Sequence, residues 1–429
     1  MRRDSARTRN RKRKKNIDTD YPKVHKILIS MVTCLLVLFI IIAIFYYFKN
    51  RNDYQNLVET SKQELEQENQ ENKDDSSDEE EEEPVDVTFT LSAIGDIMCH
   101  NTQYIDAYNE DTDTYDFSYV FDDISLYTKT ADICIGNLET TFAGEEVGYS
   151  SYPTFNTPDS LAYELKDLGV DVLSTAGNHA LDKGFDGLSR TIDTLNAADI
   201  AHLGTYKTEE DQNKTLIKYV KGIKIAFVNY TYGTNGIAIP SDKPYCVNLI
   251  DEDLMKKQID SAKEENPDII IACMHWGNEY KTTQNSTQEE LADFLFQNGV
   301  DIILGTHPHV LEPMEKRTVT LEDGSTKDGF VIYSLGNFIA DQNAEYTRDS
   351  IILNIDITKH VDGTMSIDNY EYIPIYMYKD STKSKQKMKL LDINKTIYNY
   401  ENYIDTSISE SLYNTLKSEL SKIQGILDT

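Results

Sequence analysis

Two histidines separated by a single proline end an apolar segment, DIILGTHPH, at residues 301–309. A serine or an asparagine would form such a turn equally well, so a pair of imidazoles at this point indicates a chemical role. Imidazole is a common ligand of divalent transition metals, and Pro308 restricts the backbone between the two rings. We therefore interpret His307 and His309 as metal ligands whose rings diverge toward neighbouring cations.

Four further segments follow the same plan, in which a short apolar run ends in a small residue and then in an acid, an amide or a histidine. They are VTFTLSAIGD (87–96), ADICIGNLET (131–140), GVDVLSTAGNHALDKG (169–184) and DIIIACMHWGNEY (268–280). The polar residues at the five ends are Asp96, Asn137, Glu139, Asn178, His179, His275, His307 and His309. Borderline divalent metals favour imidazole with carboxylate, and a bridging carboxylate lets two cations lie about 3.5 to 4 Å apart. Together the five ends predict a centre for one or two divalent ions.

Each of these residues also has an ordinary structural interpretation. A single histidine after a strand more often packs in a turn than binds a metal. Asn178 could cap the helical turn that follows it, and Asp96 could be a turn residue. Five ligand-bearing ends in one domain favour the metal centre over all of these alternatives holding together.

Weaker candidates lie close to the same ends. Glu279 and Tyr280 could contact a substrate, or they could be inert surface residues. Asn337 could face the site, or it could form a turn with the glycine before it. His202, in the segment DIAHLGT, is expected to be structural.

The elements that must position these residues alternate between strand and helix. Helical patterns separate the apolar segments at residues 158–168, 185–197, 252–265 and 287–297. Two stretches, LKDLGVDVLSTAGNH and LFQNGVDIILGTHPH, both read as helix end, glycine cap, strand and histidine. This alternation predicts an α/β fold with its active groups at the carboxyl ends of the strands.

The last part of the chain shows two further patterns. Residues 364–378 alternate as late strands, and apolar residues at helical spacing follow from Ile408 to Leu427. That helix is either docked on the domain or available to a partner.

The N-terminal region is expected to anchor the protein in a membrane. Residues 27–48 form an uncharged, mostly apolar run of the length that a helix needs to cross a bilayer, and no cleavage site follows it. Eleven Lys and Arg residues precede the run, so the positive-inside rule places the N-terminus in the cytosol and the rest outside. We rank a nucleic-acid role for this basic tail low, because topology already explains its charge.

An acidic stalk is predicted after the anchor, because QELEQENQENKDDSSDEEEEEP has almost no aliphatic residues and repels itself. The formal net charge of the chain is −31, which disfavours loosely held anionic polymers unless metal ions invert the local field. The five cysteines lack the spacing of a disulfide framework. The expected divisions are a basic tail (1–26), an anchor (27–48), a disordered stalk (49–86), a main domain (87–378) and a C-terminal extension with an amphipathic helix (379–429).

The ordered set GDIM (95–98), GNLE (136–139), AGNHALDKG (176–184), HWGNEY (275–280), GTHPH (305–309) and YSLGNF (333–338) resembles the capsule synthesis protein family of CapA type, associated with poly-γ-glutamate. That family belongs to the calcineurin-like metallophosphatase superfamily. The resemblance covers residues 89–376 and implies a four-layer α/β/β/α sandwich. It also implies that Asp96 and His309 bind one ion, that Glu139 bridges, and that Asn178, His275 and His307 complete a second position. His179 is implied as a general acid or charge stabiliser, oriented by Asp182.

One position departs from the superfamily. Its first motif is Asp-x-His, whereas this chain has Met98 there, and thioether is a poor ligand for Mn²⁺ or Zn²⁺. His100 could substitute, or the first ion could be weak or absent.

Together with the predicted anchor, the resemblance implies a membrane-anchored hydrolase outside the bacterial cytosol, using one or two ions of manganese, zinc or iron on a phosphoester or amide. The expected partners are an anionic surface polymer such as poly-γ-glutamate and membrane synthase or export subunits. The alternative is a non-catalytic accessory protein that helps to export or tether such a polymer.

Overall fold

The computed structural model describes residues 85–427. The predicted tail (1–26), anchor (27–48) and stalk (49–86) lie outside the described residues, except for the last two residues of the stalk. Of these, Asp86 already contacts the domain, because its carboxylate accepts a hydrogen bond from the Val361 backbone at 2.9 Å. Among residues 85–427, no helix combines the length and the apolar character needed to cross a bilayer.

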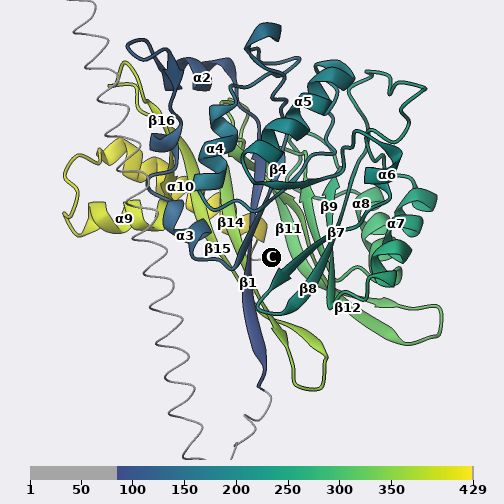
Figure 1. The fold of residues 1–429 in the computed structure, drawn as a ribbon. Helices are drawn as coiled ribbons and strands as arrows, with labels where there is room; N and C mark the ends of the chain where they lie inside the picture. The colour runs from purple at the N-terminus through teal and green to yellow at the C-terminus, as the bar shows by residue number, and fades with distance from the viewer. Residues whose placement is uncertain (1–84, 428–429) are drawn as a thin grey trace, which may run out of the picture. The chain divides into compact units, whose positions relative to one another are not determined.

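The first sheet is built around β1 (Val87–Ile97), which runs through its middle (Figure 1). On one side it pairs in parallel with β4, and β5 and β6 continue the parallel half. On the other side it pairs antiparallel with β14, followed by β15 and β16. The other strands of this sheet are β4 (Ile133–Leu138), β5 (Val172–Ser174), β6 (Ala201–Leu203), β13 (Asn337–Ile339), β14 (Asp349–Lys359), β15 (Met365–Lys379) and β16 (Met388–Asp392).

The second sheet has a parallel centre with an antiparallel strand at each edge. Its order is β11, β12, β10, β9, β8 and β7, and the four central strands are parallel. Its strands are β7 (Leu216–Val220), β8 (Ile223–Thr231), β9 (Ile269–His275), β10 (Ile302–Thr306), β11 (Leu311–Thr320) and β12 (Thr326–Leu335). A small separate hairpin joins β2 (Tyr108–Asn109) and β3 (Thr114–Tyr115).

Apolar side chains hold the two sheets face to face. Leu91 and Ile135 of the first sheet share a buried cluster with Ile271 and Leu304 of the second. Burying a side chain of this size contributes about 1.5 to 3 kcal/mol. Because strands in a half-buried sheet alternate between two faces, this inner face leaves an outer face on each sheet for helices.

Helices cover the outer faces (Figure 1). Leu165 of α4 and Leu195 of α5 pack on the first sheet, and Ile259 of α7 and Leu295 of α8 pack on the second. The helices are α2 (Asn101–Ala107), α3 (Ser125–Lys129), α4 (Ser160–Asp167), α5 (Gly184–Ala197), α6 (Glu209–Gln212), α7 (Glu252–Glu264), α8 (Ser286–Gln297), α9 (Ile393–Glu401) and α10 (Glu410–Leu427), with 3-10 turns at Ser118–Val120 and Glu145–Val147. The predicted α/β class is confirmed, with helices, sheet, sheet and helices in successive layers.

The two similar stretches of sequence form equivalent units in opposite sheets. α4 leads through Gly169 into β5, and α8 leads through Gly299 into β10. The two glycines have φ values of +95° and +108°, in the region that residues with a Cβ rarely adopt, so both act as the predicted caps. The polar residues that follow β5 therefore lie at the end of the first sheet, and those that follow β10 lie at the end of the second.

The described residues of the predicted C-terminal extension, 379–427, pack on the main domain. β16 adds a strand to the first sheet beside β15, and α10 packs against β11, β14 and β15. Leu416 and Ile423 of α10 are fully buried in the cluster between the sheets. The helix is docked, and its apolar face is covered by its own domain rather than left for a partner.

Candidate metal centre

The predicted ligands meet where strands of both sheets end. Asp96 is the penultimate residue of β1, and Glu139 directly follows β4 in the same sheet. His275 ends β9, and His307 and His309 follow β10 in the other sheet. All five side chains are nearly or completely buried. Residues far apart in the sequence thus come together at one edge of the two sheets.

The first group consists of Asp96, Glu139 and His309, whose potential ligand atoms lie within 4.8 Å of one another. Nδ1 of His309 is 3.1 Å from Oδ2 of Asp96, and Nε2 of His309 is 3.7 Å from Oε1 of Glu139. Both nitrogens of this ring therefore face carboxylate oxygens.

The second group consists of Glu139, His275 and His307, again within 4.8 Å. Nε2 of His275 is 3.7 Å from Oε1 of Glu139 and 3.2 Å from Oδ1 of Asn178. The amide nitrogen of Asn178 donates to the Tyr232 hydroxyl at 3.3 Å. Asn178 does not cap α5, which begins at Gly184. It faces the second group instead.

Glu139 belongs to both groups, and this sharing is what a bridging ligand requires. Both of its carboxylate oxygens are buried without a hydrogen-bond partner. Two ligands that share a cation at about 2.0 to 2.2 Å lie about 3 to 4 Å apart, which the two 3.7 Å separations match. Burial, followed by repulsion from Asp96, raises the pKa of Glu139 well above its usual value. A buried carboxyl group without a hydrogen-bond partner is a suitable ligand for a cation, because the positive charge would compensate the carboxylate.

His275 and His307 are in the neutral form that a metal ligand requires. Burial and then the neighbouring His307 lower the pKa of His275 well below its usual value. Burial and then His309 lower the pKa of His307 to about 3. Both rings are therefore neutral near pH 7, which is the form that binds metals.

Hydrogen bonds around the groups orient two of the ligands. Nδ1 of His275 is 3.1 Å from Oγ1 of Thr306, which in turn donates to the Met274 carbonyl at 3.3 Å. Nδ1–H of His275 donating to Thr306 leaves Nε2 with its lone pair toward Glu139. Nδ2 of Asn137 donates to Oδ1 of Asp96 at 2.9 Å. This hydrogen bond from Asn137 helps to orient the Asp96 carboxylate.

His179 lies beside the two groups and is in neither of them. Its Nδ1 is 2.8 Å from Oδ2 of Asp182, which also accepts a hydrogen bond from the Phe155 backbone at 2.6 Å. The edge of the His179 ring packs on Phe155 with centroids 4.8 Å apart. His179 is therefore held by its Nδ1 side, and Nε2 remains near the Asn235 amide, 3.4 Å away.

The structure separates the remaining candidates. Nδ1 of His100 is 3.1 Å from the Met98 carbonyl and accepts from the Asp341 backbone N–H at 3.2 Å, and His100 is in no ligand group of residues 85–427. Met98 is 2% exposed and packs with Phe155 and Ala340, so an apolar side chain fills the position where the resemblance led us to expect a histidine.

Asn337 and the pair Glu279–Tyr280 border the centre. β13 places Asn337 beside Asp96 in register, and Oδ1 of Asn337 is buried without a partner. Tyr280 packs against His309 with ring centroids 6.1 Å apart. An oxygen of the exposed Glu279 lies within 4.8 Å of ring nitrogens of His307 and His309.

Sequence reasoning missed two residues that contact the predicted set. Tyr232 packs on His307 with centroids 4.5 Å apart, and Asn235 lies near His179. Both belong to the segment FVNYTYGTNG at the end of β8. This segment is a sixth apolar run ending in polar residues and a glycine, so the same pattern would have identified it.

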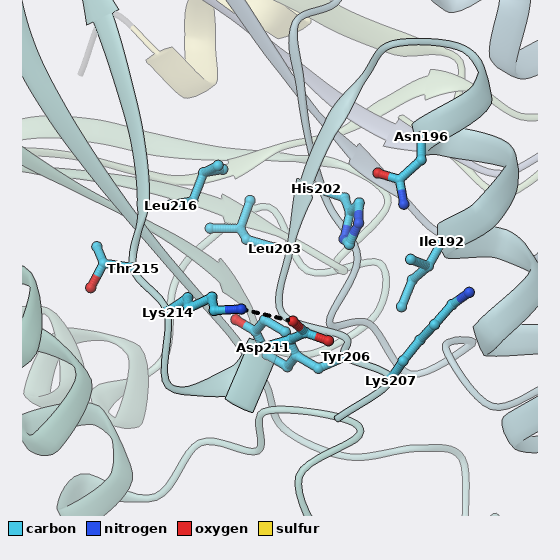
Figure 2. Close-up of a pocket in the computed structure, with 10 residues that line it drawn as sticks. All are labelled: Ile192, Asn196, His202, Leu203, Tyr206, Lys207, Asp211, Lys214, Thr215 and Leu216. Carbon is cyan, nitrogen blue, oxygen red and sulfur yellow. Dashed lines mark hydrogen bonds and ion pairs between the residues drawn. The ribbon is translucent and has the colours of Figure 1, made fainter. Parts of the chain in front are cut away.

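A separate cavity of about 310 Å³ lies beside the edge strand β6 and the start of β7 (Figure 2). It is lined by Ile192, Asn196, His202, Leu203, Tyr206, Lys207, Asp211, Lys214, Thr215 and Leu216. None of the predicted ligands lines it. Nδ1 of His202 is buried without a partner, and burial lowers the pKa of this histidine.

Comparisons with known proteins agree with the resemblance seen in the motifs. The model of the family described as bacterial capsule synthesis protein PGA_cap matches residues 90–342. The chain is 30% identical over 304 residues to the capsule biosynthesis protein CapA of Bacillus anthracis, covering 68% of this chain and 69% of that protein. It is also 30% identical over 307 residues to the PGA biosynthesis protein CapA of Bacillus subtilis, covering 70% and 77%.

Similarities to solved structures are weaker. The NAD nucleotidase of Haemophilus influenzae matches with a TM-score of 0.41 and 13% identity, over 80% of this chain and 61% of that one. A calcineurin-like phosphoesterase of Bacillus subtilis matches with a TM-score of 0.40 and 16% identity, over 79% and 98%. This chain therefore spans about three fifths of the nucleotidase, and at these TM-scores the likeness carries no argument about activity.

Proposed function

Because the chain belongs to the bacterial capsule synthesis protein PGA_cap family, we propose that it is a metal-dependent hydrolase of capsule metabolism. Its substrate is a phosphoester or an amide bond of an anionic surface polymer such as poly-γ-glutamate. The capsule and PGA biosynthesis names of the two Bacillus relatives support this class of polymer.

We propose also that residues 27–48 anchor the protein in the bacterial membrane. In this topology the N-terminus lies in the cytosol, and the domain from Val87 onward lies outside, next to synthase or export subunits in the same membrane. The basic residues before the apolar run support this orientation.

The observation that carries the proposal is Glu139. Its two buried oxygens have no hydrogen-bond partner, and they belong to two ligand groups that come from both sheets. An unpaired buried carboxyl costs free energy unless a cation compensates it. Asp96 and His309 would hold one divalent ion, and Asn178, His275 and His307 would hold a second.

The residues around the centre support a hydrolytic role. Divalent ions held here would supply Lewis-acid polarisation of a substrate oxygen and neutralise developing negative charge. Asp182 accepts from Nδ1–H of His179, so Nε2 is the ring atom that can carry a proton to a leaving group. The Phe155 ring and its backbone N–H hold this pair in place.

The experiment combines metal analysis of the full-length protein with assays on a generic phosphodiester and on poly-γ-glutamate. We expect the wild-type protein to contain divalent metal and to hydrolyse one of the two substrates. His275→Ala and His309→Ala should each lose one of the two ions together with activity. If these variants lose metal while polymer production in cells is unchanged, the hydrolase proposal is wrong.

One observation favours a second function. Met98 fills the position of a superfamily ligand with a buried thioether side chain, so the first ion lacks one ligand. A protein from Mycobacterium tuberculosis, 26% identical over 44% of this chain, bears the name of a probable polyglutamine synthesis accessory protein. An accessory protein would bind metal and polymer without cleaving either substrate, and the same assays distinguish this outcome.

A further inference from the structure

The first ligand group is incomplete in the described part of the chain. Asp96, Glu139 and His309 supply three side chains, whereas divalent ions of this class take at least four ligands. Met98, two residues after Asp96, packs with Phe155 and Ala340 and offers no oxygen or nitrogen ligand. A further ligand must therefore come from another nearby residue, from solvent or from a substrate.

Glu279 is a carboxylate beside two of the candidate ligands, His307 and His309. It is exposed, whereas Glu139 is 1% exposed. One of its oxygens lies within 4.8 Å of ring nitrogens of both His307 and His309, and so reaches one ligand from each group. Nδ1 of His307 is itself buried without a hydrogen-bond partner.

The backbone ties Glu279 to the histidine turn. The next residue, Tyr280, has a φ of +64°, and its N–H donates to the Pro308 carbonyl at 2.8 Å. Its ring packs on His309, and its hydroxyl accepts a hydrogen bond from Gln342 at 3.4 Å. These contacts hold the backbone next to Glu279 against the histidine turn, so its side chain begins close to the two rings.

An uncompensated carboxylate at this position would repel an anionic substrate. Divalent ions would neutralise both Glu139 and Glu279, and a substrate oxygen could replace Glu279 on an ion once the carboxylate turns into solvent, where water and salt screen its charge.

We propose that Glu279 is an exchangeable metal ligand on the solvent-facing side of the centre, the counterpart of the buried Glu139, and that it gives up its place to an anionic substrate oxygen. This proposal rests on the metal centre of the proposed function. The segment HWGNEY then belongs to the ion site. Glu279 competes with phosphate or carboxylate groups of a substrate for one coordination position on the ion.

The test uses Glu279→Gln in the full-length protein, which removes the charge and keeps the size of an exposed side chain. Titration calorimetry with Mn²⁺ should show at least one ion bound roughly tenfold more weakly than in the wild-type protein. At saturating Mn²⁺, inorganic phosphate should bind the variant roughly tenfold more tightly, because its competitor is gone. Glu322→Gln, in the exposed loop between β11 and β12, is the control and should change neither affinity.

Unchanged Mn²⁺ affinity, or phosphate affinity that does not increase, overturns the proposal. If the wild-type protein binds no Mn²⁺, the proposed metal centre fails and this inference fails with it. If the wild-type protein binds Mn²⁺ and cleaves no substrate, the proposed hydrolase fails while the two shifted affinities still support Glu279 as a ligand.

Discussion

The metal centre and the cavity in Figure 2 both contain a buried histidine nitrogen without a partner, yet their surroundings differ. In the centre, unpaired imidazole and carboxylate groups from both sheets face one another. In the cavity, His202 is the single histidine among the lining residues, and the nearby charges are already paired. Lys214 bonds Glu210 at 2.9 Å, and Lys207 bonds Asp193.

This difference teaches how to weigh buried histidines. One unpaired nitrogen is compatible with ordinary packing, because its cost is small and the ring stays neutral. Several buried imidazole and carboxylate groups that face one another without hydrogen-bond partners are better explained by a cation that all of them bind. The predictions below test whether the centre depends on such a partner and the cavity does not.

The largest effect is expected from Glu139→Gln. Both ions should bind at least about 100-fold more weakly, because even partners outside the ligand set cost 10- to 100-fold. Without metal, the variant should be more stable than the wild-type protein at pH 7 by about 1 to 3 kcal/mol, since a buried, unpaired carboxyl is removed. Calorimetry with Mn²⁺ and urea unfolding in a chelator measure the two effects. Retention of one ion at wild-type affinity would show that Glu139 is not shared.

The next effect separates the two groups. His309→Ala should remove the ion held with Asp96, and His275→Ala should remove the ion held with Asn178, so each variant should keep one ion per chain instead of two. Elemental analysis after dialysis gives the ratio. If either substitution empties both positions, the centre binds a single ion.

A smaller loss of function should follow His179→Asn, with the metal retained. His179 is outside both ligand groups, so the metal content should equal that of the wild-type protein. Turnover of whichever substrate is cleaved should fall about 10²- to 10⁴-fold, the usual contribution of a general acid. A loss of metal together with activity would place His179 among the ligands instead.

The smallest effect is expected in the cavity. His202→Leu should leave metal content unchanged and alter the free energy of unfolding at pH 7 by less than about 1 kcal/mol. Burial lowers the pKa of His202 below its usual value, so this residue costs the wild-type protein stability as pH falls below about 6.5. Urea unfolding at pH 7 and pH 5 should show a smaller acid-induced loss in the variant. A metal-binding defect in this variant would contradict the contrast between the two regions.

Much of the centre was predictable because its signal is local. Each ligand follows a strand whose apolar residues are contiguous in the sequence, and parallel strands bring their ends to one edge. The sequence pattern alone therefore predicted that Glu139 and His307 lie close together, although the order in which the strands pair was unknown. The roles of these residues as ligands stay predictions until metal binding is measured.

The pairing of strands that are distant in the sequence could not be predicted from local patterns. β1 pairs with β14, and Thr90 lies opposite Asp356 although the intervening chain carries no mark of this register. The same holds for β13, which brings Asn337 to Asp96. The packing of residues 379–427 was hidden for the same reason, since β16 looks like a separate short segment until its hydrogen bonds to β15 are known.

The length of β1 has a consequence for how the protein meets its surroundings. The chain enters the domain at Val87, and Asp96 lies nine residues later on the same extended strand, about 30 Å away at about 3.3 Å per residue. The point where the chain enters the domain and the candidate ligands thus lie at opposite ends of β1. Anything attached before Val87 therefore joins the domain about 30 Å from those ligands.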